Sequence, residues 1–254
     1  MEIGNALAIK GVKRLMISEV IVVVIDMLLM FFVIYMLVPF ILTRILGIGV
    51  VSRGKAEKQI ALTFDDGPNP KYTPQLLMLL RKHDVKATFF VLGNKAEKYP
   101  QLIQQIYDEG HQIGIHNYTH RANWIMTPRE VRREQTERSA AIIERITGSR
   151  PTCYRPPWGI LNLGDLFVVR RSYRIILWTV MVRDWKQSTT SERLKRQLLS
   201  RIKPGAIVLL HDCGETLGAD EEAPQHMLEG LQAAMLEIQL KGYECMRADE
   251  LLAK

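Results

Sequence analysis

Short apolar runs alternate with amphipathic segments from about Gln59 to the end of the chain, and this alternation limits the possible folds more than any other feature. Seven runs have the length and the β-branched or aromatic content of buried strands. They are QIALTF, KATFFVL, HQIGIH, TCY, RIILWTV, AIVLL and YECM, which begin at residues 59, 86, 111, 152, 174, 206 and 243. The pattern predicts an α/β fold of parallel strands joined by helices, and leaves a barrel and an open sheet both possible.

Polar residues suited to catalysis follow five of these runs. They are the residues at 65–67, 116–120, 155–159, 183–185 and 211–212. Taken singly they are weak signals, because an Asp-Asp-Gly sequence is common in turns and an H-x-x-x-H pair often binds nothing. In either kind of sheet, however, the carboxyl ends of parallel strands lie together and form the active site. Their joint occurrence therefore predicts a single site.

Three of these residues form a possible metal site. Asp66, His116 and His120 supply a carboxylate and two imidazoles, which is the ligand set of a hydrolytic zinc ion with one open position. Asp65 is then free to act as a base toward a water whose pKa the ion lowers toward about 7. The ion would also offset the repulsion between the adjacent carboxylates, and Arg155 is a second candidate cation for that purpose.

The strand-end residues resemble the five motifs of the polysaccharide deacetylases of carbohydrate esterase family four, the NodB-homology domain. The motifs of that family are T-F-D-D-G, H-S/T-x-x-H, R-x-P-x-G, D-x-x-D-W and L-x-H-D. In this chain they occupy residues 63–67, 116–120, 155–159, 181–185 and 209–212. The resemblance covers about residues 58–254 and implies a distorted (β/α) barrel with about seven strands.

The resemblance also implies metal-dependent de-N-acetylation of a cell-envelope polysaccharide, most readily peptidoglycan. It implies one divalent metal ion, usually zinc and sometimes cobalt or nickel, held by Asp66, His116 and His120. Asp65 would take a proton from the metal-bound water that attacks the acetamide, and His211 would protonate the departing amine. The other implied residues are Arg155, which steadies Asp65, Asp184, which orients His211, and the substrate-binding residues Trp158, Trp185 and Leu209.

Two positions depart from the family motifs. Asn117 replaces the usual Ser or Thr of the second motif, and we expect it to alter the support of a neighbouring metal ligand. Met181 replaces the first Asp of the fourth motif. Because Asp184 is retained, we interpret Met181 as a change at the wall of the substrate groove that leaves catalysis in place.

The amino-terminal segment has a different character. Residues 20–42 are apolar apart from Asp26, Tyr35 and Pro39, and are long enough to cross a hydrocarbon core of roughly 30 Å. Core helices are rarely apolar on every face, and cleaved signal peptides have a shorter apolar region of roughly 7 to 15 residues. We therefore expect a short basic cytoplasmic segment at 1–19, a transmembrane signal anchor at 20–43, a linker at 44–57 and the catalytic domain at 58–254.

Charge leaves the orientation of this anchor open. Three basic residues precede the apolar segment and four follow it, namely Lys10, Lys13 and Arg14, and Arg44, Arg53, Lys55 and Lys58. The implied substrate favours one orientation. Envelope glycans lie outside the membrane, so we expect the catalytic domain to be extracytoplasmic. The net charge of +7 comes with no nucleic-acid-binding motif, so the expected partners are a polysaccharide and the membrane.

Other functions fit the same residues. A hydrolase of this fold could act on chitin oligomers or on O-acetylated polysaccharides, and a catalytically impaired homologue could bind the envelope without turnover. The last alternative predicts the loss of a metal ligand or of the base, and all of them are present. The sequence leaves open which polysaccharide and which sugar is deacetylated.

Overall fold

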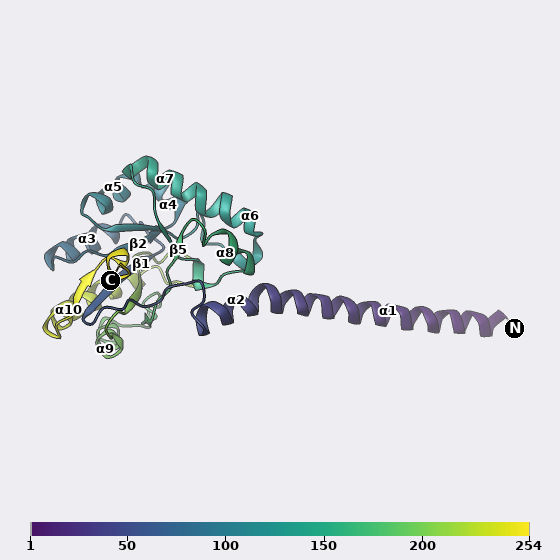
Figure 1. The fold of residues 1–254 in the computed structure, drawn as a ribbon. Helices are drawn as coiled ribbons and strands as arrows, with labels where there is room; N and C mark the ends of the chain where they lie inside the picture. Colours follow the sequence, from purple (N-terminus) through teal and green to yellow (C-terminus); the bar gives the residue numbers. More distant parts are fainter. Residues whose placement is uncertain (1, 254) are drawn as a thin grey trace.

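Strand β1 (Gln59–Asp65) lies in the middle of a parallel sheet in the computed structural model, which describes residues 2–253 (Figure 1). The other strands are β2 (Thr88–Val91), β3 (Gln112–Ile115), β4 (Cys153–Tyr154), β5 (Arg174–Ile175), β6 (Val180–Met181), β7 (Ile207–His211) and β8 (Glu244–Met246). Their order is β5-β4-β3-β2-β1-β7-β6, and β8 pairs with the first residues of β1. In the described chain β5 and β6 do not pair, so the sheet is a curled half-barrel and the predicted distorted barrel is confirmed.

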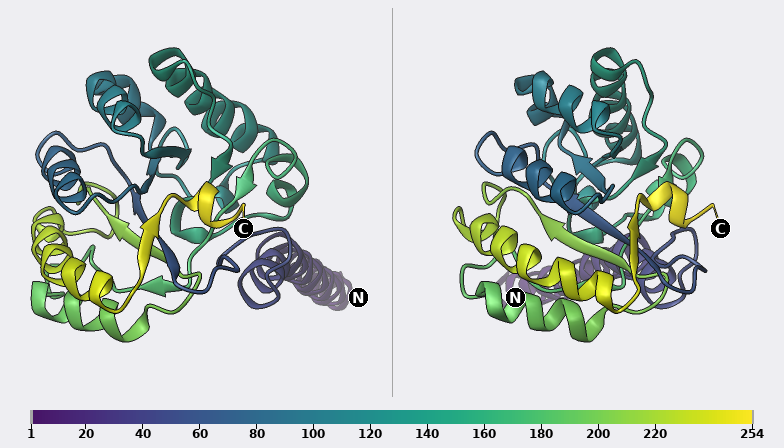
Figure 2. Two further views of the ribbon diagram at one scale, coloured as in Figure 1. Left: turned by 60° about the vertical axis from the view of Figure 1, so that its left-hand side comes forward. Right: turned by 90° about the vertical axis from the view of Figure 1, so that its left-hand side faces the viewer.

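Helices cover the outer side of this sheet (Figure 2). They are α3 (Thr73–Lys82), α4 (Gly93–Lys98), α5 (Pro100–Asp108), α6 (Pro128–Glu130), α7 (Arg138–Thr147), α8 (Leu163–Val168), α9 (Ser191–Arg201) and α10 (Ala223–Leu240), whereas α11 (Ala248–Leu251) packs with Ala61 on the inner side. Three further helical segments are the 3₁₀ helices η3 (Asn123–Ile125) and η5 (Pro157–Gly159) and the π-helix η4 (Val131–Glu137). The helices supply the connections that parallel strands require, because such strands cannot be joined by tight turns.

Successive residues of β1 face opposite sides of the sheet. Ile60, Leu62 and Phe64 join the large apolar core beneath the helices, whereas Ala61 joins a smaller apolar cluster on the inner side. Side chains alternate along a strand, so Thr63 and Asp65 continue the inner row toward the carboxyl end. Both are buried although they are polar. The strand therefore places the Asp65 carboxylate inside the half-barrel, at the carboxyl end of the sheet.

The predicted strand over residues 174–180 is divided in two. Its first part, β5, pairs with β4, and its last residue begins β6, which pairs with β7 at the other end of the strand order. The backbone between them crosses from one edge of the curled sheet to the other. The chain before β1 reinforces this crossing, because Val51 hydrogen-bonds with Ile175 and Leu177 at 2.9 and 2.8 Å.

The amino-terminal segment is one long helical arm (Figure 1). It consists of α1 (Glu2–Phe32), η1 (Val33–Leu37), α2 (Val38–Phe40) and η2 (Ile41–Ile45), of which η1 and η2 are π-helical. By length and composition, Met16–Ile45 is long and apolar enough to cross a membrane. Residues 16–32 are exposed throughout. The cytoplasmic segment, the anchor and the linker stay predictions.

The end of the arm is attached to the rest of the chain. Pro39 and Thr43 are buried, and the Tyr35 hydroxyl donates a 2.7 Å hydrogen bond to the carbonyl of Met126. Gly54, farther along the predicted linker, donates a 2.8 Å hydrogen bond to the carbonyl of Gly205. The segment between the arm and β1 is therefore held against the half-barrel at several points.

Candidate active site

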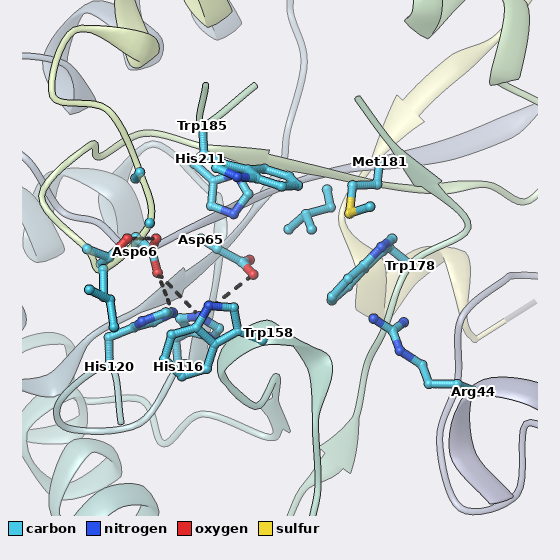
Figure 3. A pocket seen from close by; sticks show the side chains of 15 residues that line it. Arg44, Asp65, Asp66, His116, His120, Trp158, Trp178, Met181, Trp185 and His211 are labelled. Carbon is cyan, nitrogen blue, oxygen red and sulfur yellow. Dashed lines mark hydrogen bonds and ion pairs between the residues drawn. The ribbon is translucent and has the colours of Figure 1, made fainter. Parts of the chain in front are cut away.

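A pocket of about 290 Å³ opens at the carboxyl ends of β1, β3 and β7 (Figure 3). Eight of the ten predicted site residues line it, namely Asp65, Asp66, His116, His120, Trp158, Trp185, Leu209 and His211. The other two, Arg155 and Asp184, are buried and hydrogen-bond to Asp65 and His211. The residues that the sequence places at separate strand ends thus come together in one place.

Asp66, His116 and His120 form the only group of residues in the described chain with the spacing of a three-ligand metal site. Their ligand atoms all lie within 4.8 Å of one another, and Asp66 Oδ1 is 3.3 Å from His116 Nε2 and 3.4 Å from His120 Nε2. The backbone at Asp66 has a φ of 75°, in the left-handed region. The chain therefore leaves the extended path directly after Asp65, and both neighbouring carboxylates reach the pocket.

The donor set and its surroundings fit a divalent cation. Asp66 Oδ1 is buried and has no hydrogen-bond partner among the described residues, which is costly for a carboxylate oxygen unless a cation lies beside it. His116 Nδ1 lies 2.8 Å from the carbonyl of Arg155, an arrangement that leaves Nε2 free to bind a metal. Burial lowers the pKa of His120 to about 4, so this imidazole is neutral, as a ligand must be.

Asp65 is held by a buried arginine. Arg155 Nη1 donates to Asp65 Oδ1 at 2.7 Å and to the Thr63 hydroxyl at 2.7 Å, and its guanidinium lies 4.1 Å from the ring centroid of Phe90. The second carboxylate oxygen, Asp65 Oδ2, lies 3.9 Å from His116 Nε2. Arg155 therefore holds one oxygen of Asp65, while the other oxygen lies in the pocket near His116.

His211 lies at the end of β7 and is paired with Asp184. Its Nδ1 is 3.2 Å from Asp184 Oδ1, and its backbone N–H donates to Asp184 Oδ2 at 2.6 Å. Burial disfavours protonation of His211, but the Asp184 carboxylate outweighs that cost and raises the pKa of His211 to about 9. Trp185 packs edge-on against the imidazole at 5.3 Å. The pairing with Asp184 therefore favours the protonated form of His211, which is a proton donor, on this side of the pocket.

Asn117 is integrated into a buried hydrogen-bond network. Its backbone has a φ of 68°, which asparagine tolerates better than serine or threonine. Its side chain donates to Asn123 Oδ1 at 2.9 Å and to the carbonyl of Arg121 at 3.1 Å, and accepts from the Tyr154 hydroxyl at 2.8 Å. The substitution thus supports the turn between the two histidines. Its effect on metal affinity and activity stays a prediction.

Met181 lies in the wall of the pocket and is 37% exposed, where we expected a groove residue. Sequence reasoning missed other lining residues, which are Arg44, Trp178, Thr216, Leu217, Gly218 and Ala219. Thr216 is the most informative of them, because its hydroxyl donates to Asp66 Oδ2 at 2.6 Å and leaves Oδ1 for a cation. The only sequence signal for this residue is its position in the loop that follows β7.

Comparison with known proteins agrees with this geometry. The family model described as polysaccharide deacetylase matches residues 52–169. A peptidoglycan-N-acetylglucosamine deacetylase from Listeria monocytogenes is 36% identical over 201 residues. The match takes in 79% of this chain and 40% of the Listeria protein, so the chain spans less than half the length of that relative.

Two solved structures share the fold. The peptidoglycan N-acetylglucosamine deacetylase Bc1960 superposes with a TM-score of 0.75 at 29% identity, over 84% of this chain and 96% of that one. BA3943 from Bacillus anthracis, described as a pseudoenzyme of carbohydrate esterase family four, gives a TM-score of 0.70 at 27% identity, over 79% and 67% of the two chains. The family model takes in the first three motifs, and the sequence relative and both structures match most of this chain: the chain belongs to the polysaccharide deacetylase family, carbohydrate esterase family four.

Proposed function

We propose that the chain removes N-acetyl groups from peptidoglycan by hydrolysis. The observation that carries this proposal is that a carboxylate fixed by an arginine and an imidazole charged by an aspartate line one pocket, with the three-ligand cluster beside them. A base and an acid whose environments are this different are what amide hydrolysis requires. The names of the Listeria relative and of Bc1960 support peptidoglycan as the polymer.

The cation site has a defined role in this proposal. Asp66, His116 and His120 would hold one divalent ion, for which zinc suits the nitrogen and oxygen donors, with cobalt or nickel as substitutes. When bound, such an ion polarises an acyl oxygen and lowers the pKa of a water toward about 7. The histidines and Asp66 are thereby assigned to binding, and proton transfer is left to Asp65 and His211.

Proton transfer follows from the two fixed side chains. Asp65 Oδ2 would accept one proton from the attacking water, while Arg155 keeps Oδ1 from turning toward the pocket. His211 Nε2 would give its proton to the amine nitrogen as the carbon–nitrogen bond breaks, with Nδ1 held by Asp184. Acetic acid and a free amine leave, and the acid gives its remaining proton to the amine or to solvent to become acetate. The proton gained by Asp65 equals the one lost by His211. Trp158, Trp185 and Leu209 would enclose the acetyl group and exclude other water.

The arm provides the location in this proposal. We take residues 1–19 as cytoplasmic, 20–43 as a single-pass anchor, 44–57 as the connection and 58–254 as the extracytoplasmic catalytic domain. The length and apolar composition of Met16–Ile45 support an anchor. The outward orientation rests on the position of peptidoglycan outside the membrane.

The first test is acetate release by residues 1–254 in detergent. We expect release from peptidoglycan to exceed release from chitin oligomers and from acetylated xylan, to stop with a chelator and to return with Zn²⁺. Release from xylan alone would instead make the chain an O-acetyl esterase. No release from any of the three by the zinc-loaded protein would favour the impaired envelope-binding alternative.

Two aspartate variants separate the base from the ligand. Asp65→Asn keeps an acceptor for Arg155, so we expect it to bind one cation per chain while acetate release falls at least about 100-fold. Asp66→Ala removes a ligand and should lose the cation as well as the activity. Metal content by elemental analysis and acetate assays give both readouts. An Asp65→Asn protein that keeps more than a tenth of the wild-type rate would contradict the role of Asp65.

The pH dependence tests the pair formed by His211 and Asp184. His211 must be protonated to donate, so its contribution is present below its pKa and is lost as the pH rises through it. In Asp184→Asn the carboxylate charge that raises this pKa is gone, and the alkaline loss of kcat should begin nearer the ordinary histidine value of about 6.5. The measurement is kcat between pH 5 and 10. An alkaline limb that does not move would remove His211 from the role of acid.

Thr216 offers a test of the cation site that does not depend on turnover. Thr216→Val deletes the hydroxyl that holds Asp66 Oδ2, and such outer partners typically contribute 10- to 100-fold to metal affinity, so we expect a loss of about that size. Thr216→Ser, which keeps the hydroxyl, is the matched control. Competition with a chromophoric chelator measures both affinities. Equal zinc affinity in the two variants would show that Thr216 does not position Asp66.

A further inference from the structure

Arg44 links the amino-terminal arm to the active-site pocket. It lies in η2, the last helical segment of the arm, and lines the same pocket as Asp65 and His211 (Figure 3). It precedes the segment that matches the family model, which begins at residue 52. The arm therefore brings a guanidinium into the pocket from the amino-terminal side of that segment.

The position of this guanidinium is defined by its neighbours. Its central carbon lies 4.1 Å from the ring centroid of Trp178, a distance typical of a cation–π contact. It also packs against Gly159, where an added Cβ would lie 2.6 Å from Arg44 Nη2. Arginine side chains at a protein surface usually have many accessible conformations. Stacking on an indole reduces that freedom and preorganises the group for binding.

Arg44 has no acidic partner. Its side chain is half-buried, and no carboxylate lies within 4.0 Å of it among the residues that the structure describes. The acids of the pocket have other neighbours, since Asp65 is paired with Arg155 and Asp66 lies against the two histidines. A partly desolvated cation gains free energy from an anion that it can bind in a bidentate manner.

The wall next to Arg44 is also free of acids. In Figure 3 Trp178 lies beside the guanidinium and Met181 lies beyond the indole, and both are across the pocket from Asp66 and His120. Methionine and tryptophan give an apolar surface on which a sugar ring can pack, and neither repels a negative charge. The charge at this end of the pocket is therefore positive and uncompensated.

We propose that Arg44 binds an anionic group, a carboxylate or a phosphate, carried by the substrate beside the acetamido sugar. The inference rests on the proposed function in that the acetamide lies at the cluster of Asp66, His116 and His120 when the anion lies at Arg44. Two sources of such an anion differ in location. A carboxylate would belong to a sugar of the polymer itself, whereas a phosphate would belong to a saccharide still linked to lipid.

Binding of small saccharides to residues 1–254 in detergent tests this proposal without turnover, with the quenching of tryptophan fluorescence as the readout. The probes are two matched pairs. The first pair is the disaccharide of N-acetylglucosamine and N-acetylmuramic acid and its methyl ester. The second is N-acetylglucosamine 1-phosphate and the methyl glycoside of N-acetylglucosamine. We expect the wild type to bind the charged member of one pair at least about tenfold more tightly than its neutral match.

Variants of Arg44 decide whether this side chain is the cause. Arg44→Gln should reduce that preference to nearly one, and Arg44→Lys should keep part of it because it keeps the charge. Arg133→Gln, an exposed arginine of η4 outside the pocket, should behave as the wild type. A preference within the first pair identifies a polymer carboxylate, and one within the second identifies a lipid-linked phosphate.

Two results would overturn the proposal: no preference for charge in the wild type, or equal weakening of the charged and neutral probes by Arg44→Gln. An acetate assay on the same samples tests the proposed function separately. If the protein releases no acetate but still prefers charged probes through Arg44, the proposed hydrolysis is wrong and the anion site stands.

Discussion

The buried pair of Arg155 and Asp65 is the interaction on which the rest of the site depends. Arg155 donates to Asp65, to the Thr63 hydroxyl and to the carbonyls of Ile176 and Leu177. Those two carbonyls belong to the backbone that crosses between β5 and β6, where strand pairing is interrupted. One guanidinium therefore supplies donors to the break in the half-barrel and also fixes the proposed base. A buried ion pair is rarely the most stable solution for a protein interior, which supports a functional reason for this one.

The two adjacent aspartates differ because the backbone and their partners differ. Asp65 ends a strand whose inner row is buried, and an arginine lies behind it. Asp66 begins a left-handed turn, and imidazoles and a threonine hydroxyl surround it. Neighbouring carboxylates in water would be nearly equivalent. Burial with different partners gives them different surroundings, and this difference suits one to bind a cation and the other to act as a base.

Much of the site could be predicted from sequence because its residues immediately follow strands. The ends of parallel strands converge wherever the sheet curls, so the motifs located Asp65, His116 and His211 without any knowledge of packing. The division of the run at 174–180 could not be predicted, because strand pairing at opposite edges leaves no mark on hydropathy. Thr216 and Arg44 were missed for a related reason. The loop between β7 and α10 and the end of an apolar helix carry no periodic signal that relates them to the pocket.

Trp178 connects the arm to the catalytic interior. Its ring lies 4.1 Å from the guanidinium of Arg44 and 5.6 Å from that of Arg155, so one indole separates the end of the arm from the arginine that holds Asp65. A variant that lacks residues 1–52 would lose Arg44 and the hydrogen bond from Tyr35 to Met126. That side of the pocket would then be open to water. The end of the arm is therefore a wall of the active site as well as part of a candidate anchor.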